Sequence, residues 1–404
     1  MRKILKFTGV LLLVFSVLTV SLVLYGQKKI PDRIILTYGT DINVNPVFRF
    51  SPESGSDSGE ENSYSVKVSL LNLIPIKTSH VTMTKRHYVI AGGDIFGLKI
   101  YSDGVIIIGT GAVETEDGQS SPAEEAGIRK GDIILEIDGK KVSGSDEVSS
   151  IFQNCEGREM TIKLHRSGSE FTTSIKPVFS SCDRIYKSGM WIRDSAAGIG
   201  TITYVDPSTG MYGSLGHAIC DCDTQEVIPI SNGEAVSAVI TGCYKGTKGK
   251  AGELCGVFSP KHFGSILING ESGAYGEADN ISFPYELIPV ASRNEIRPGK
   301  AQIISTVSGT EKKSYNIEIT KINYSDDSGK DMSIKVTDSD LIEKTGGIVQ
   351  GMSGSPIIQN GMLVGAVTHV FINDSLRGYA IFADSMLEIS DNLYNSVMKI
   401  QDAA

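Results

Sequence analysis

The 404-residue sequence has few aromatic residues, few cysteines and no block of basic residues beyond its extreme N-terminus. Its six cysteines are too few for a disulfide scaffold of the kind that stabilises small secreted proteins. The net charge is −9, whereas a protein that binds nucleic acid needs clustered Lys and Arg to neutralise phosphate. The composition therefore argues against nucleic acid as a partner.

Glycine, in contrast, is abundant. There are 44 glycines, and aromatic residues make up only 7% of the chain. This combination suits short strands and frequent turns better than a helical bundle, so we predict a mainly β protein. At roughly 150 residues per domain, the chain is long enough for two or three domains.

Residues 7–25 form an apolar run without a single charge, and basic residues precede it. As a helix with a rise of 1.5 Å per residue, this run is roughly 28 Å long, about the thickness of the hydrocarbon core of a bilayer. We predict an uncleaved transmembrane anchor at 7–25, with residues 1–6 in the cytoplasm and the bulk of the chain outside it. A cleaved signal peptide is the alternative, although Leu22 to Tyr25 are poorly suited to a cleavage site.

Residues 26–87 are expected to be extended, with an acidic linker at 51–62. That stretch is rich in Ser, Gly and acidic residues and has no large apolar side chain. We predict that it is solvated and accessible to proteolysis.

The segment 88–180 has the pattern of a small β-sandwich with one helix. Asp138-Gly139 is a hairpin signal, and Val148, Ile151 and Phe152 share one face of a helix that Ser145 can cap. Two stretches with the alternation of strands follow this helix.

The run SPAEEAGIRKGDIILEIDGKKV, residues 121–142, resembles the signature segment of PDZ domains in bacterial proteases. The resemblance implies that Ile95, Phe96, Gly97 and Leu98 form the loop whose backbone amides hold the terminal carboxylate of a peptide. An extended peptide, either a protein C-terminus or a segment of this chain, would then add a strand between this loop and the helix. A groove closed by a neighbouring domain is the alternative.

Residues 181–404 show short strands and many glycines, which predicts an all-β domain. Within it, residues 351–356 (GMSGSP) place Ser353 between glycines, just before an apolar β-hairpin. The glycines allow a tight turn that exposes the serine hydroxyl and lets the amides of Gly351 and Ser353 converge as an oxyanion hole. A serine before a hairpin matches the trypsin-like arrangement, and a plain loop between strands is the alternative.

A nucleophilic serine needs a base, and the base needs an acid that orients it. His217, in a Gly-rich segment near the start of the domain, is the leading candidate base, whereas His369 is a candidate wall residue on the strand after the serine. Asp338 is the leading candidate acid, although its neighbours also fit the start of a short helix. Asp206 and Asp340 remain open.

Three segments resemble the SpoIVB (stage IV sporulation protein B) peptidases of endospore-forming bacteria: YGSLGHAI, KVTDSDLIEKTGGIVQGMSGSPII and GAVTHVFIND, at residues 212–219, 335–358 and 365–374. The resemblance places the family's catalytic histidine, aspartate and serine on His217, Asp338 and Ser353. It implies a PDZ domain followed by a trypsin-like, double-barrel serine peptidase domain at residues 181–404.

The resemblance also implies a role in sporulation. Such a peptidase is made in the forespore, is exported to the space between two membranes, and cuts an inhibitory membrane protein. This cut releases an intramembrane protease that processes the precursor of a late sigma factor. Family members also cleave themselves near the N-terminus, and we expect that cut in the linker at 51–62.

Four cysteines do not match the pattern of the family: Cys220, Cys222, Cys243 and Cys255. A zinc site, a disulfide and free thiols are the three interpretations, and we predict free thiols, no metal and no cofactor. Two other functions stay open. One is a non-catalytic PDZ adaptor with a protease-like β domain, and the other is a zinc-stabilised binding protein.

Overall fold

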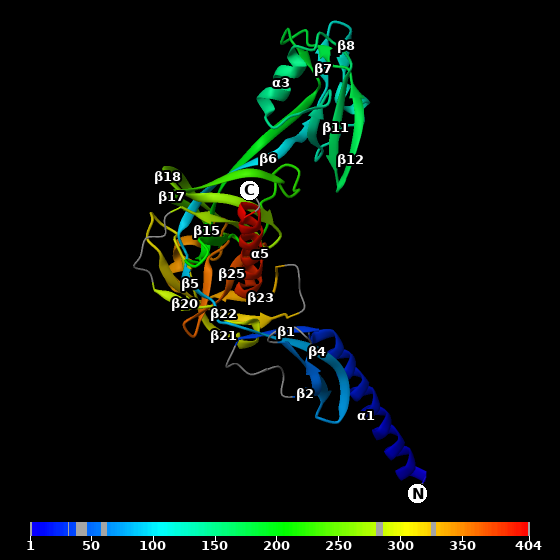
Figure 1. The fold of residues 1–404 in the computed structure, drawn as a ribbon, viewed down its shortest axis with the longest axis vertical. Coiled ribbons are helices and arrows are strands. Elements are labelled where there is room, and N and C mark those ends of the chain that lie inside the picture. Colours follow the sequence, from blue (N-terminus) through cyan, green and yellow to red (C-terminus); the bar gives the residue numbers. More distant parts are fainter. Residues whose placement is uncertain are drawn as a thin grey trace.

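The computed structural model describes residues 2–30, 32–37, 47–57, 63–279, 286–324 and 329–402. Strands hold 53% of the residues and helices 17%, so the prediction of a mainly β protein is confirmed. Figure 1 shows three parts along the long axis of the molecule: an N-terminal helix with a small sheet, a β-rich body, and a smaller domain at the end far from the N-terminus.

The N-terminal part consists of α1 (Arg2–Lys29) and a sheet with the strand order β1-β4-β3-β2. These strands are β1 (Arg33–Thr37), β2 (Phe48–Asp57), β3 (Ser63–Leu70) and β4 (Ile74–Thr84). Within α1, the stretch Phe7–Lys28 is long and apolar enough to cross a membrane, with a mean hydropathy of 2.6. The helix thus contains the segment that the sequence predicted as an anchor.

The predicted linker at 51–62 is in part a strand. Residues 51–57 belong to β2, which pairs antiparallel with β3, and residues 58–62 lie outside the described residues. At the start of β2, Phe48 packs with Val68 and Leu70 in a small core. This apolar contact holds the beginning of β2 against β3, whereas composition alone indicated a solvated segment.

The smaller domain has the predicted design of a sandwich with one main helix. Its elements are the second half of β6 (Ile95–Thr110), β7 (Val113–Thr115), β8 (Gly118–Ser120), α2 (Pro122–Glu125), β9 (Ile133–Ile137), β10 (Lys140–Lys141), α3 (Ser145–Gln153), β11 (Met160–Arg166), β12 (Ser169–Ile175), β13 (Val178–Phe179), β14 (Tyr186–Lys187) and the start of β15 (Met190–Val205). Helix α3 buries Val148 and Phe152 in one core with Ile134 and Ile162 of the sheet. The apolar spacing of this segment therefore predicted both the helix and its buried face.

Strands β6 and β15 run through both the smaller domain and the body, and they pair with each other along their length (Figure 1). In the body, the first half of β6 also pairs on its other edge with β17 (Ile230–Tyr244). Ile95, Phe96, Gly97 and Leu98 therefore lie in the middle of a sheet of the body, where all four side-chain positions are buried. Because their backbone groups pair with β15 and β17, the prediction that these residues form the peptide-binding loop is corrected.

The body contains two rings of six strands. In the first ring the strand order is β6-β17-β18-β19-β16-β15, and the pairing of β15 with β6 closes it. The second ring is a closed barrel with the order β21-β22-β23-β26-β25-β24. The further strands are β16 (Met211–Ser214), β18 (Glu253–Gly270), β19 (Gly273–Ala278), β21 (Gly299–Ser305), β22 (Lys313–Ile322), β23 (Met332–Val336), β24 (Pro356–Gln359), β25 (Met362–Phe371) and β26 (Asp374–Phe382). The predicted double-barrel architecture is therefore present.

Short elements and one long helix complete the body: β5 (Tyr88–Ala91), β20 (Leu287–Pro289), the 3₁₀ turn η1 (Arg293–Glu295), α4 (Ser339–Thr345) and α5 (Ala383–Asp402). Helix α5 packs across the junction of the two rings. Its Met386 and Leu387 share a core with Tyr204 and Tyr275 of the first ring and Leu363 of the second. This apolar contact holds the rings together on the side that α5 covers.

Candidate active site

Ser353 lies in a tight turn just before β24, at the junction of the two rings. Gly354 has a φ of +93°, and a Cβ there would lie 2.0 Å from the carbonyl oxygen of Thr201, so only glycine fits. The backbone N–H of Gly354 donates to the carbonyl of Val367 (2.7 Å), and that of Thr201 donates to the carbonyl of Ser353 (3.0 Å). The turn is thereby fastened to β15 of the first ring and to β25 of the second.

Two backbone amides beside the serine are free to bind an anion. The carbonyl of Gln350, in the same peptide unit as the Gly351 N–H, accepts from the N–H of Leu254 (2.9 Å). The carbonyl of Met352, in the same peptide unit as the Ser353 N–H, accepts from the N–H of Ser355 (3.0 Å). Because the C=O and N–H of one trans peptide unit point in opposite directions, these bonds orient the amides of Gly351 and Ser353. In the described part of the chain, neither amide donates a hydrogen bond.

His217 follows β16 of the first ring, in a turn where Leu215 and Gly216 have left-handed backbone, with φ of +66° and +72°. Gly216 lies against the second ring, since a Cβ there would be 2.9 Å from Cγ2 of Thr368. The Nδ1 of His217 lies 2.8 Å from the carbonyl oxygen of Ala218, so a proton on Nδ1 is donated to this oxygen and Nε2 stays unprotonated.

The environment of His217 favours the neutral imidazole. Burial lowers the pKa of His217 below its ordinary value, and the hydrogen bond to the Ala218 carbonyl opposes this shift. A neutral imidazole with an unprotonated Nε2 is the form that a general base requires.

His217 and Ser353 line the same cleft between the rings, which has a volume of about 720 Å³. His369 of β25 lines it as well, and the centroids of the two imidazole rings are 4.7 Å apart. Desolvation, with smaller contributions from positive charge on His217 and Lys330, lowers the pKa of His369 to about 4. Near neutral pH both imidazoles that face the cleft are therefore uncharged.

The serine hydroxyl is held away from the histidine in this structure. The Oγ of Ser353 donates to the carbonyl of Thr368 at 2.8 Å, and in the described residues no hydrogen bond joins Ser353 to His217. Rotation about the Cα–Cβ bond of Ser353 would release the hydroxyl from the Thr368 carbonyl.

Asp338, the leading candidate acid, has other partners. It is the N-cap of α4, and its Oδ1 accepts from the backbone N–H groups of Asp340 (3.1 Å) and Leu341 (3.2 Å). Its Oδ2 accepts from the N–H of Asn316 (3.1 Å). Among the described residues no hydrogen bond joins Asp338 to His217, so its place in a triad stays a prediction.

The other two candidate acids are also engaged elsewhere. The carboxylate of Asp340 pairs with Lys344 on the next turn of α4, at 2.7 Å. Asp206 accepts hydrogen bonds from the backbone and hydroxyl of Ser208. In the part of the chain that the structure describes, neither aspartate forms a hydrogen bond or ion pair with His217.

All six cysteines are free thiols. Cys220 and Cys222 line the cleft and are exposed, whereas Cys243 and Cys255 lie on β17 and β18. Within the described ranges, the one group with metal-ligand spacing that contains a cysteine joins Cys222 to two aspartates. The structure therefore does not gather the four thiols into a zinc site.

The segment that carries this cleft matches a known family. The family model described as SpoIVB peptidase S55 aligns with residues 184–387, just over half of the chain. The chain belongs to the SpoIVB peptidase S55 family. A PDZ domain model matches residues 118–166, within the smaller domain. The chain is therefore a serine peptidase that carries a PDZ domain.

Parts of this chain are also similar to individual known proteins. Serine protease HTRA1 of Xenopus tropicalis is 37% identical over 68 residues, which are 17% of this chain and 15% of that protein. The chain thus matches only a small part of this curated relative. Two solved structures are also similar. The PDZ domain of an SdrC-like protein from Listeria monocytogenes is 22% identical, and the match covers 22% of this chain and 87% of that chain with a TM-score of 0.19. A protease from M. tuberculosis in its active form is 15% identical, and the match covers 48% of this chain and 73% of that chain with a TM-score of 0.31.

Proposed function

We propose that this chain is a membrane-anchored serine endopeptidase in which Ser353 is the nucleophile and His217 the general base. The amides of Gly351 and Ser353 form the oxyanion hole in this proposal. The observation that carries it is the meeting of Ser353 and His217, from two different rings, in one cleft with two unpaired amides beside the serine. The neutral form of His217 that burial favours also supports the role of a base.

The reaction begins when the Ser353 hydroxyl leaves the Thr368 carbonyl and turns toward the Nε2 of His217. As Oγ attacks the scissile carbonyl carbon, Nε2 takes the hydroxyl proton, and the two amides stabilise the negative charge that develops on the carbonyl oxygen. His217 then gives the proton to the leaving amine as the C–N bond breaks. Water hydrolyses the acyl-enzyme with His217 again acting as base, and loss of either residue should lower the rate by on the order of 10⁴ or more.

Asp338 is kept as the proposed third member of the triad. Its support is the resemblance of the segment 335–358 to the family, because its own hydrogen bonds are those of a helix cap. The two roles make different demands on the side chain: a cap needs any short acceptor, whereas orienting an imidazolium needs a carboxylate.

We place the activity in sporulation signalling on the far side of a membrane. The apolar helix α1 supports the anchor, and the family resemblance supports an N-terminus in the cytoplasm and a body in the forespore intermembrane space. The proposed substrate is an inhibitory membrane protein whose cleavage triggers intramembrane processing of a late sigma factor precursor. Self-cleavage near the N-terminus is part of the same proposal, with residues 51–62 as the expected region.

The PDZ domain supports a peptide as a further partner. Since residues 95–98 pair on both edges, we place the peptide beside α3, where a cavity of about 330 Å³ is lined by Ser149, Phe152 and Trp191. The indole of Trp191 is 64% exposed and offers an apolar surface there. A protein C-terminus and a segment of this chain are both candidates for the peptide.

Labelling of the full chain in detergent with a fluorophosphonate probe tests the catalytic proposal. We expect labelling that is absent in Ser353→Ala and reduced by several orders of magnitude in His217→Ala. His262→Ala, which changes an exposed histidine outside the cleft, is the matched control and should label normally. If the folded wild-type chain does not label, with or without peptides that bind the PDZ domain, the non-catalytic adaptor becomes the better description.

A further inference from the structure

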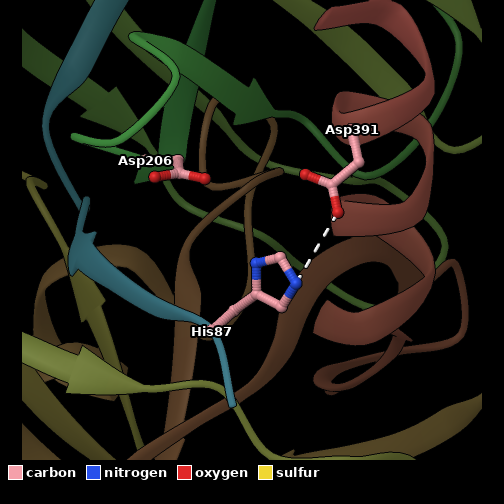
Figure 2. A group of neighbouring side chains, drawn as sticks. All are labelled: His87, Asp206 and Asp391. Atoms are coloured by element: carbon pink, nitrogen blue, oxygen red, sulfur yellow. Dashed lines mark ion pairs between the residues drawn. The ribbon is translucent and has the colours of Figure 1, made fainter. Parts of the chain in front are cut away.

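Three ligand-type side chains meet on the side of the body that α5 covers, and the peptidase reaction uses none of them. His87 immediately precedes β5, Asp206 immediately follows β15, and Asp391 lies in the middle of α5 (Figure 2). Each offers one ligand atom, and these three atoms all lie within 4.8 Å of one another. Segments that are far apart in the sequence therefore bring two carboxylates and one imidazole to a common point.

Among the described residues, neither carboxylate of this group forms an ion pair with a lysine or an arginine. Asp206 is only 3% exposed, and both hydrogen bonds from Ser208 go to its Oδ1, at 2.8 and 2.7 Å. Among the described residues its Oδ2 accepts no hydrogen bond and keeps some contact with solvent, whereas a carboxylate in a buried residue is normally paired with a charge or bound to a metal. The Nε2 of His87 is 3.7 Å from the Oδ2 of Asp391, longer than a hydrogen bond.

A further acidic side chain lies beside the group, since Glu388 lines the same cavity as His87 and Asp391. Lys85 lines the adjoining cavity, yet among the described residues no ion pair joins it to either aspartate. Among the described residues, the imidazole of His87 is therefore the one ionisable group of opposite sign that pairs with these carboxylates.

A second group with ligand spacing, Asp221, Cys222 and Asp223, provides an internal comparison. There the guanidinium of Arg193 pairs with Asp221 at 2.5 Å and with Asp223 at 2.8 Å. A fixed cation already occupies that position, so a metal ion would have to displace it. Of the two groups with ligand spacing among the described residues, the one around Asp206 has no lysine or arginine paired with its carboxylates.

We propose that His87, Asp206 and Asp391 bind one divalent transition-metal ion, with Zn²⁺ as the best match. Imidazole nitrogen and carboxylate oxygen are suitable zinc ligands, and two carboxylates balance the charge of the ion. Ligand atoms in a tetrahedral zinc site lie about 3.5 Å apart, so the side chains must approach by roughly 1 Å. His87 and Asp391 have side chains that are 43% and 37% exposed, which leaves them room for this movement.

The bound ion would be a structural link. It would fasten α5 to the turn after β15 and to the point where the chain enters β5 from the N-terminal sheet. A cavity of about 240 Å³, lined by His87, Glu388 and Asp391, gives the ion a path from solvent. Since Ser353 and His217 lie in a different cleft, the ion takes no part in the peptide cleavage proposed above.

Metal binding by the full chain, purified in detergent with a tag that contains no histidine, tests this proposal. After EDTA treatment and its removal, we expect one equivalent of Zn²⁺ to bind per chain, measured by competition with a chromogenic zinc indicator. Saturating Zn²⁺ should raise the Tm by on the order of 5 °C. Co²⁺ in place of Zn²⁺ should give d–d absorption without a thiolate charge-transfer band, because no cysteine is a ligand.

The variants separate this site from the rest of the chain. His87→Gln and Asp391→Asn change partly exposed side chains, so both should fold, and both should lose at least tenfold in zinc affinity together with the Tm shift. His262→Gln, which alters another exposed His–Asp pair, and Cys222→Ser should bind as the wild type does. A chain that binds no Zn²⁺, or that loses the ion in Cys222→Ser but keeps it in Asp391→Asn, would overturn the proposal. Fluorophosphonate labelling of Ser353 in the same samples reports separately on the peptidase site.

Discussion

The hydroxyl of Thr201 is expected to control the oxyanion turn without touching the substrate. Thr201 is 0% exposed, and its Oγ1 donates to the carbonyl oxygen of Gly351 at 2.8 Å. Thr201→Val keeps the shape of the side chain but leaves this carbonyl without its donor. An unsatisfied buried carbonyl costs about 1–3 kcal/mol, and Gly351, with a φ of +95°, has the backbone freedom to rotate toward a new partner.

The Gly351 carbonyl belongs to the peptide unit that links Gly351 to Met352, between the two oxyanion amides, so its reorientation would disturb the convergence of the Gly351 and Ser353 N–H groups. Removal of one oxyanion donor typically lowers kcat by about 10²–10³. We therefore expect Thr201→Val to slow fluorophosphonate labelling of Ser353 by on the order of 10²-fold, with a fall in Tm of only a few degrees. The rate of labelling, followed by gel fluorescence, and thermal unfolding of the same samples measure the two effects.

Thr203 provides the matched control for this prediction. It lies two residues further along β15, is also 0% exposed, and its Oγ1 donates to the carbonyl of Gly354 at 2.8 Å. Thr203→Val should therefore lower the Tm to the same extent but slow labelling less than tenfold. Equal losses of labelling in the two variants would indicate general loosening of the turn, and an unchanged rate in Thr201→Val would refute the reasoning.

Three further predictions concern the same turn and its partners. Because burial lowers the pKa of His217 from its ordinary 6.5, the neutral base persists as the pH falls, and the labelling rate should reach half its maximum below pH 6.5; a midpoint at or above 6.5 contradicts this. Asp338→Ser keeps a capping oxygen for α4, so the free energy of unfolding should change by no more than about 1 kcal/mol. If the Asp338 carboxylate orients His217, the labelling rate should nevertheless fall by about 10⁴-fold. Labelling of Asp338→Ser at the wild-type rate would exclude Asp338 from the triad. Gly354→Ala places a Cβ 2.0 Å from the Thr201 carbonyl oxygen and should unfold the turn. Gly361 also has a positive φ, but no atom lies within 4 Å of an added Cβ, so Gly361→Ala should lower the free energy of unfolding by only about 1 kcal/mol, measured by thermal unfolding.

Local sequence patterns predicted the elements whose causes are local. The uncharged run at 7–25 is long enough for a spanning helix by its length alone, and α1 covers it. The spacing of Val148 and Phe152 defines one face of a helix, and α3 buries both. The glycines around Ser353 predicted a tight turn because positive φ is a property of single residues.

Predictions about a segment failed or stayed open where its structure depends on which distant part of the chain packs beside it. Residues 95–98 resemble a peptide-binding loop, but the long pairing of β6 with β15 and β17 uses their backbone groups. Asp338 has the composition of both a helix cap and a triad acid, and its hydrogen bonds to Asn316 and α4 are those of a cap. Neither strand partner nor cap partner can be read from a segment taken alone.

Chain length, glycine content and residue spacing act within a few turns of backbone, so they were sufficient to predict the membrane-length helix, the mainly β architecture and the chemistry of the serine turn. Which side chains share a site depends instead on how distant segments pack. The tertiary structure brought His217 of one ring to Ser353 of the other, and it assembled His87, Asp206 and Asp391 from three separate segments. Closure of a β ring and the packing of α5 are set by long-range pairing and apolar burial, whose partners lie far apart along the chain.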